Sequence, residues 1–229
     1  MLQSIIIIAN FLILSLIIVR AKQGYGSGEQ NWGFVDVREG AHMFYWLYYT
    51  TANVIYYTER PLVVWLQGGP GLSATGHGNF LQIGPFDLSG NPRNHTWVKD
   101  MNVLFIDSPV GSVFSFVDNT SYLTSNNNEI TMDLVAFMKG FFELNSEFED
   151  IPLHIFCVSY GGKMGSEFAL ELHNAIQKGD VRSNFKSINM GNPWIAPIDS
   201  MKEWAPLLMK IGIIDHVGFE NINKTGSAI

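Results

Sequence analysis

The chain has 229 residues and a formal net charge of −7, with 14 Lys+Arg against 21 Asp+Glu. Charged residues make up 15% of it, below the roughly 25% of an average soluble domain, and 13% of it is aromatic, which excludes intrinsic disorder. The acidic balance, with no run of Lys or Arg, argues against nucleic acid as a partner, and the single cysteine, Cys157, excludes an internal disulfide and a cysteine-rich zinc site.

An apolar segment without charged residues extends from Ile5 to Val19, and Arg20 follows it. This pattern predicts a secretory signal peptide over residues 1–21, because the small residues Val19 and Ala21 suit cleavage after Ala21. An uncleaved signal anchor is the alternative, since about 18 to 20 apolar residues can span a bilayer. The rest of the chain, residues 22–229, is predicted to be one domain without stable membrane association once the leader is removed.

Three sequons for N-glycosylation support passage through the secretory pathway. They begin at Asn94, Asn119 and Asn223. Together with the leader they predict a secreted protein or one of a lysosomal or vacuolar lumen.

The predicted elements alternate between strands and helices. Aromatic and β-branched residues in Trp32–Val37 and His42–Thr51 predict a hairpin. Short apolar runs predict buried strands at Pro61–Leu66, Asn102–Ile106, Pro152–Val158 and Phe185–Met190, and helical spacing predicts helices at Asn127–Leu144 and Lys163–Gln177. This order predicts an α/β protein with a largely parallel central sheet, fronted by an antiparallel hairpin.

Ser159 lies between a predicted strand and a predicted helix, with the small residues Cys157 and Gly161 two positions before and after it. This spacing is typical of a nucleophile elbow, a sharp turn that exposes the serine Oγ above the sheet. The turn also directs the Tyr160 backbone N–H at a developing oxyanion. The alternative is an ordinary strand-to-helix turn.

A glycine-rich loop, Gln67–Gly71, follows the predicted buried strand Pro61–Leu66. Its consecutive backbone N–H groups are suited to supply a second oxyanion donor, although the same residues also make a tight turn. Two such loops after buried strands of one sheet predict acyl transfer by a serine hydrolase. The histidines show no spacing typical of metal ligands, and we expect neither a metal nor a cofactor.

Five motifs in order resemble those of the serine carboxypeptidases of the α/β-hydrolase type. They are WLQGGPG (Trp65–Gly71), GNFLQIGP (Gly78–Pro85), NVLFIDSPVGSVFSF (Asn102–Phe116), SYGGKM (Ser159–Met164) and GNPWIAPIDS (Gly191–Ser200). The resemblance covers essentially all of residues 22–229.

The resemblance implies a role for several residues. Ser159 is the nucleophile, and the N–H groups of Gly69 and Tyr160 form the oxyanion hole. Gln67 and Gly68 bind the terminal carboxylate of the substrate. The implied reaction is the release of C-terminal residues from peptides or proteins, favoured at acidic pH.

Three residues depart from the family pattern. Val158 and Gln82 stand where the family has glutamates, so both carboxyl groups are missing. Gln82 keeps a hydrogen-bond donor for the substrate carboxylate, whereas Val158 does not, and the loss of one such donor costs about 1–3 kcal/mol. Val113 replaces a family glycine, from which we expect a change in loop shape.

The general base is not evident in the sequence. A serine nucleophile needs a histidine oriented by a carboxylate, and in the family both follow later strands than this chain contains. His77 is the best candidate here, and the neighbours Asp215 and His216 are a weaker one.

The resemblance therefore implies an incomplete α/β-hydrolase fold: the N-terminal part of the central sheet, its flanking helices and the start of the lid insertion. We expect an unpaired apolar sheet edge that promotes self-association.

Two functions from different classes stay open. The first is a serine carboxypeptidase, acting through an acyl-enzyme on Ser159, in a form that lacks the Asp and His of the triad. The second is a secreted, non-catalytic homologue that binds peptides. An esterase or acyltransferase on the same scaffold is a third and weaker hypothesis.

Overall fold

The computed structural model describes residues 24–226, so the predicted signal peptide lies outside the described residues. Seven strands form one sheet. They are β1 (Gln30–Arg38), β2 (Ala41–Tyr48), β3 (Leu62–Leu66), β4 (Asn102–Ile106), β5 (Phe116–Val117), β6 (Pro152–Val158) and β7 (Asn184–Gly191). The helices are α2 (Asn127–Leu144), α3 (Tyr160–Lys178), α4 (Pro197–Lys202), α5 (Trp204–Lys210) and α6 (His216–Gly226).

The strand order is β1-β2-β4-β3-β6-β7, with the short β5 paired to β2. β1, β2 and β4 pair antiparallel, whereas β4, β3, β6 and β7 pair parallel. The predicted parallel sheet fronted by an antiparallel hairpin is therefore confirmed. β3 lies between β4 and β6, so the loops that follow these three strands meet at one edge of the sheet.

Two hydrophobic clusters cover opposite faces of the sheet, because neighbouring side chains of a strand point to opposite sides. Val64 and Leu66 belong to the cluster formed with α2 and α3, which includes Phe137 and Phe168. Trp65, between them, belongs to the other cluster, which includes residues of the helical segment Ala74–Ile83. β3 is consequently buried along its whole length.

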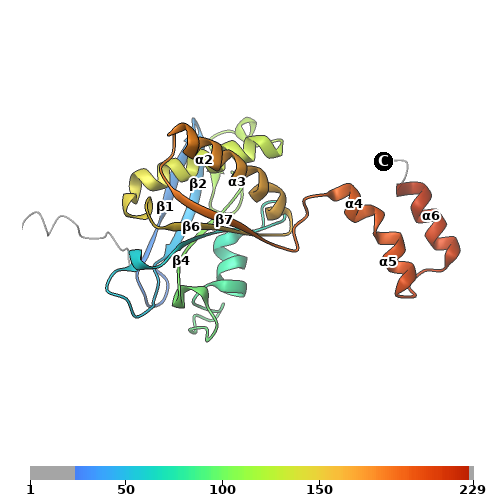
Figure 1. The fold of residues 1–229 in the computed structure, drawn as a ribbon, viewed down its shortest axis with the longest axis horizontal. Helices are drawn as coiled ribbons and strands as arrows, with labels where there is room; N and C mark the ends of the chain where they lie inside the picture. The colour runs from blue at the N-terminus through green and yellow to red at the C-terminus, as the bar shows by residue number, and fades with distance from the viewer. Residues whose placement is uncertain (1–23, 227–229) are drawn as a thin grey trace, which may run out of the picture.

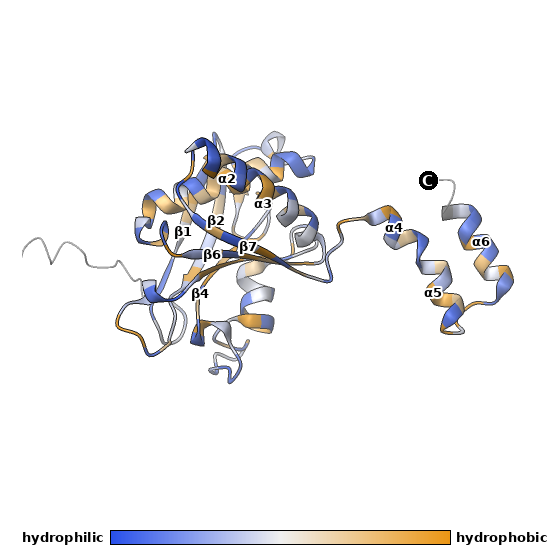
Figure 2. Cartoon of the chain, viewed as in Figure 1, coloured by the Kyte–Doolittle hydropathy of each residue, from blue (hydrophilic) through white to orange (hydrophobic). Residues whose placement is uncertain are grey.

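The helices that cover the first face are amphipathic, and Figure 2 shows hydrophilic and hydrophobic residues mixed along α2 and α3. α2 has the predicted bounds, and the side chain of Asn126 accepts a hydrogen bond from the backbone N–H of Glu129 as its N-cap. α3 begins at Tyr160, three residues before the prediction, because Ser159 itself makes the turn out of β6. Gly179 ends α3 in the left-handed conformation.

Several elements had no prediction. Ala74–Ile83 forms a π-helical segment, and β5 adds two residues to the sheet beside β2. The helices α4, α5 and α6 form an arm that extends away from the sheet after β7 (Figure 1). Trp204 and Leu207 of this arm are more than half exposed.

The outer edge of β7 is unpaired among residues 24–226, since β6 is its partner on the inner side. Phe185 and Ile188 of β7 pack against the core cluster, and Lys186 is the one charged residue of the strand. No helix in residues 24–226 is long and apolar enough to cross a bilayer.

Candidate active site

Ser159 forms a strained turn between β6 and α3. Its φ of 57° and ψ of −124° are unusual for a residue with a side chain. The turn is held on both sides, because Ser159 N donates to Gly191 O at 3.2 Å and Ser159 O accepts from Gly162 N and Trp194 N at 2.9 and 2.8 Å. The side chain is exposed. A conformation of this kind, maintained by its surroundings, is characteristic of functional sites.

Small residues let α3 approach the sheet beside this turn. A Cβ on Gly161 would lie 2.7 Å from the backbone O of Leu66, and one on Gly165 would lie 2.9 Å from Cys157 Sγ. Cys157 is buried, and this burial raises the pKa of its thiol to about 11. It therefore packs as a small apolar residue and is not a nucleophile.

The glycine-rich loop lies directly against Ser159. β3 and β6 are neighbours, with Leu66 paired to Cys157 at their ends. A Cβ on Gly68 would lie 2.8 Å from Ser159 Cβ, so the two backbones are in contact there. Gly69 has a φ of 116°, which glycine adopts without strain. Tyr160 is the first residue of α3, so its N–H has no acceptor within the helix and is available to an oxyanion.

The two glutamines predicted to bind the substrate carboxylate lie in different surroundings. Gln67 is buried, and its Oε1 accepts a hydrogen bond from Trp65 Nε1 at 2.8 Å, which leaves its amide nitrogen as a donor. Gln82 lines a cavity with Arg93, His95 and Trp97, where its Oε1 is buried without a hydrogen-bond partner. No hydrogen bond joins Gln82 to Gln67 or Ser159 in the described part of the chain.

The structure places the other two departures from the family pattern as well, and nothing in it explains why valine stands at either position. Val158 packs against the cluster around Trp65, and its backbone O lies 2.8 Å from the site of a Cβ on Gly68. Val113 has a φ of 52°, the left-handed conformation that glycine takes more readily.

Two of the histidines are hydrogen-bonded to residues other than Ser159. His42 contacts Asp36 and Asp118, and His154 contacts Ser187 at 2.8 Å. In residues 24–226, no hydrogen bond joins Ser159 Oγ to any histidine, the predicted candidate His77 included. The described residues thus present the exposed hydroxyl of Ser159 without a histidine hydrogen-bonded to it.

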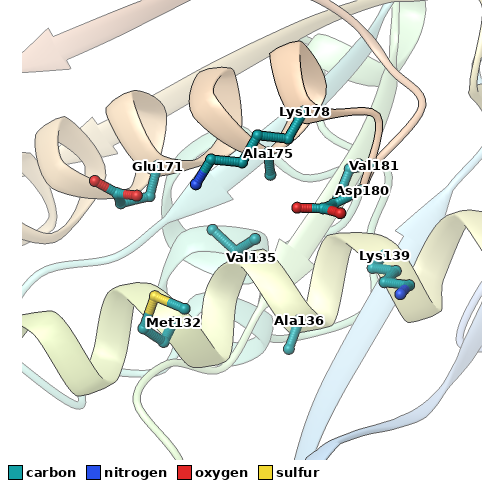
Figure 3. A pocket seen from close by; sticks show the side chains of 9 residues that line it. All are labelled: Met132, Val135, Ala136, Lys139, Glu171, Ala175, Lys178, Asp180 and Val181. Carbon is teal, nitrogen blue, oxygen red and sulfur yellow. The ribbon is translucent and has the colours of Figure 1, made fainter.

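A groove between α2 and α3 is distinct from this site. Figure 3 shows Met132 and Val135 of α2 facing it from one side and Glu171 and Lys178 of α3 from the other. None of the predicted site residues lines it. It lies on the helical layer and not at the edge of the sheet where Ser159 turns.

One charged residue at that edge escaped the sequence analysis. Asp107 follows β4 directly and is completely buried. The sequence could have indicated this residue by one feature, a carboxylate directly after a buried apolar strand. Ala74 and Thr75, which donate to its carboxylate, lie more than thirty positions away along the chain, so no local pattern identified them.

The parallel sheet, the strained serine between β6 and α3 and the glycine loop after β3 define a protein of the α/β-hydrolase class. The family model described as "Serine carboxypeptidase" matches residues 22–228, so the chain belongs to the serine carboxypeptidase family.

Curated relatives agree with this assignment. Retinoid-inducible serine carboxypeptidase of Rattus norvegicus is 44% identical over 202 residues, a stretch that is 88% of this chain and 45% of the relative. The protein of the same name from Homo sapiens is 41% identical, with the same two coverages. Serine carboxypeptidase-like 51 of Arabidopsis thaliana is 37% identical over 206 residues, 88% of this chain and 44% of the relative. The chain thus spans somewhat less than half the length of these relatives.

A solved structure shows the same fold. The crystal structure of Kex1(delta)p, a prohormone-processing carboxypeptidase from Saccharomyces cerevisiae, superimposes with a TM-score of 0.74 at 23% sequence identity. The match covers 86% of this chain and 47% of the yeast protein. The predicted α/β-hydrolase fold is therefore confirmed for the part of the chain that the structure describes.

Proposed function

We propose that this chain carries the nucleophile and the oxyanion hole of a serine-type carboxypeptidase, which releases C-terminal residues from peptides or proteins. The observation that carries the proposal is the strained turn of Ser159 with the Gly68 backbone against it. We infer that this arrangement offers the exposed hydroxyl together with the backbone N–H groups of Gly69 and Tyr160, as acyl transfer requires.

The chemistry follows from these positions. Ser159 Oγ attacks the carbonyl carbon of the last peptide bond, and the N–H groups of Gly69 and Tyr160 stabilise the negative charge on the carbonyl oxygen. The C–N bond then breaks, the terminal residue leaves as an amine that takes up the proton lost by Ser159 Oγ, and an acyl ester remains on Ser159 until water hydrolyses it. Gln67, Gly68 and Gln82 bind the terminal carboxylate of the substrate.

The proton of Ser159 Oγ has to pass to a general base. Residues 24–226 hydrogen-bond no histidine to this oxygen, so we expect slow turnover by this chain on its own. The formation of the acyl-enzyme is then a more sensitive measurement than steady-state peptide hydrolysis.

Labelling of the purified chain with a fluorophosphonate probe tests the proposal. We expect one label per molecule, located on Ser159 by peptide mass spectrometry, and none on the Ser159→Ala variant. Ser166→Ala is the matched control, because Ser166 lies on the same helix with its hydroxyl bonded to Gly162 O at 2.8 Å. An unlabelled wild-type protein would contradict a catalytic function.

A non-catalytic peptide-binding function is the alternative. Two observations favour it. No histidine is hydrogen-bonded to Ser159 Oγ in the described residues, and Val158 is apolar where the family has a glutamate. Peptide binding needs neither a general base nor an acidic pH. Calorimetry with a peptide and its C-terminal amide separates the two functions when combined with labelling. Binding that requires the free carboxylate, without any label on Ser159, supports the alternative.

We also propose that the protein enters the secretory pathway, and the exposed side chains of Asn94 and Asn119 are consistent with glycosylation. Expression in a secreting cell line should give a mature N-terminus at Lys22 and a mass that falls on deglycosylation. An unprocessed N-terminus would favour the signal anchor instead.

A further inference from the structure

The carboxylate of Asp107 binds the residues that follow the glycine-rich loop. Asp107 Oδ1 accepts hydrogen bonds from the backbone N–H groups of Ala74 and Thr75 at 3.0 and 3.1 Å. Asp107 Oδ2 accepts one from Thr75 Oγ1 at 2.8 Å. Ser73 Oγ lies 3.4 Å from Oδ1. Both carboxylate oxygens are thus bonded to the start of the helical segment Ala74–Ile83.

Asp107 is itself held rigidly in the sheet. Its backbone N–H donates to Phe44 O at 3.1 Å, and its backbone O accepts from Ser115 Oγ at 2.5 Å. Ser115 Oγ in turn accepts from the backbone N–H of Phe44 at 2.8 Å. The carboxylate therefore has a fixed position relative to the end of β4, from which it orders a neighbouring loop.

The ordered loop is the one that contains Gly68 and Gly69. Leu72 N donates to Gly68 O at 3.1 Å, so the loop closes immediately before the residues that Asp107 binds. A Cβ on Gly71 would lie 3.2 Å from Ser112 Oγ, which places the loop against the segment that follows Asp107 as well. A displacement of Ser73–Thr75 would therefore move Gly69.

A buried carboxylate is a costly way to hold a helix start. Burial raises the pKa of Asp107, and the hydrogen bonds from Thr75, Phe114 and Ala74 act against this rise. The helix start already has a cap in Ser73, whose Oγ accepts from Gly76 N at 2.7 Å. The carboxylate of Asp107 is a second, charged acceptor that fixes the position of this helix start. An oxyanion donor needs a fixed position, whereas a helix start alone does not.

We propose that Asp107 is a positioning residue for the oxyanion hole, whose carboxylate fixes Ser73–Thr75 and thereby holds the Gly69 N–H beside Ser159. This inference rests on the proposed function in so far as it assigns the Gly69 N–H to the oxyanion. Asp107 does not touch the substrate, because it is completely buried.

Hydrogen exchange of the full chain, followed by mass spectrometry, tests the positioning without any need for activity. In Asp107→Asn we expect exchange over residues 68–76 to become about tenfold faster or more, since hydrogen bonds to a charged acceptor are lost. Residues 157–165, which contain Ser159, should keep the wild-type rate. Asp133→Asn is the matched control, because Asp133 is also a buried carboxylate but is paired with Arg38, and residues 68–76 should be unaffected by it.

The rate of fluorophosphonate labelling at Ser159 is the second measurement. The loss of one oxyanion donor lowers acyl-transfer rates by about 100- to 1,000-fold, so a displaced donor in Asp107→Asn should lower the maximal labelling rate by about 10- to 100-fold. The probe concentration at half-maximal rate should change little. Thr75→Val removes one of the hydrogen bonds to the Asp107 carboxylate, together with a longer one to Ser73 Oγ at 3.4 Å. It should give a smaller effect of the same kind, which keeps the test valid where Asp107→Asn fails to fold.

The outcomes separate this inference from the proposed function. Faster exchange confined to residues 68–76 supports the positioning, even where wild-type Ser159 takes no label and the proposed function fails. Unchanged exchange over 68–76, or equal acceleration throughout the chain, overturns the positioning. Where wild-type Ser159 is labelled, an equal labelling rate in Asp107→Asn overturns it as well.

Discussion

Gly68 acts through its lack of a side chain. A Cβ at this position would lie 2.8 Å from both Ser159 Cβ and Val158 O, so either the loop or the serine turn must move to accommodate it. We predict that Gly68→Ala lowers the rate of Ser159 labelling by about a hundredfold, the effect of displacing reacting groups by about 1 Å. Gly191→Ala is the control at the same edge, because its Cβ would meet only Cys157 O, at 3.9 Å. Equal rates for wild type and Gly68→Ala would mean that the contact has no part in the chemistry.

His42 forms a pH-dependent contact on the hairpin. Its Nδ1 lies 2.5 Å from Asp36 Oδ1 and its Nε2 lies 3.5 Å from Asp118 Oδ1, while the ring stacks on Phe116. The hydrogen bond to Asp36 raises the pKa of His42 above its ordinary value, and the charges of both carboxylates contribute to the rise against the effect of desolvation.

The raised pKa gives the direction of the pH dependence. The contribution of this group to stability is complete below the ordinary histidine pKa of about 6.5, and it is lost as the pH rises through the higher pKa of the folded state. We predict that the free energy of unfolding falls by less than about 1 kcal/mol over this range, because the carboxylates are exposed. Denaturant titrations on either side of the range measure it.

A matched pair of variants isolates the contribution of His42. Asp36→Asn should abolish most of the pH-dependent fall, whereas Asp150→Asn should retain it. The two carboxylates are similarly exposed, at 78% and 76%, but Asp150 is paired with Arg182 and not with a histidine. A wild-type pH dependence in Asp36→Asn would contradict the assignment.

At the scale of the element, the cap of α2 has a measurable share in stability. Asn126 accepts the backbone N–H of Glu129, which has no acceptor within the helix. We predict that Asn126→Ala destabilises the fold by about 1 kcal/mol and lowers the melting temperature by about 2–4 °C. Asn128→Ala is the control, since Asn128 is exposed on the first turn and caps nothing. Thermal unfolding is followed by circular dichroism. Equal melting temperatures for the two variants would disprove the role of the cap.

Elements with strong local patterns were predictable from the sequence. Asn102–Ile106 and Asn127–Leu144 have the predicted bounds because an unbroken apolar run and a capped amphipathic period identify each of them locally. The helical segment Ala74–Ile83 was not predicted, because its stability depends on Asp107 and on the cluster around Trp65. The helices of the arm were not predicted either, since large apolar residues such as Trp204 and Leu207 are exposed and only Ala205 is buried in the described part of these helices.

The residues of the candidate site also divide into those with a local sequence pattern and those without one. Ser159 and the loop Gln67–Gly71 were evident because each has a local spacing that the chemistry demands. Asp107 was not, since its role arises only when β4 and β3 pair and bring distant residues together. The surroundings of Gln82 were likewise set by tertiary packing, which places it beside Arg93 and His95.

At the scale of the whole molecule, the outer edge of β7 exposes unpaired backbone groups in the described structure. Such an edge is a template for pairing with another chain, and we predict self-association that grows with protein concentration. Met190→Lys, at an exposed position of this strand, should shift the protein toward monomer, because lysine opposes edge-to-edge pairing. Leu170→Lys on the outside of α3 is the control. Sedimentation velocity that shows equal association for both variants would place the contact elsewhere.

The position of β3 between β4 and β6 has a consequence for biosynthesis. The three loops around Ser159 belong to strands that are adjacent in the sheet but far apart along the chain. Parallel pairs of this kind form late in folding, because the entropy of closing long loops must be overcome first. Neither a nascent chain nor a folding intermediate without the β3–β6 pair contains the proposed oxyanion hole. The acyl transfer that we propose at Ser159 therefore requires the native sheet, and an incompletely folded chain should take no label.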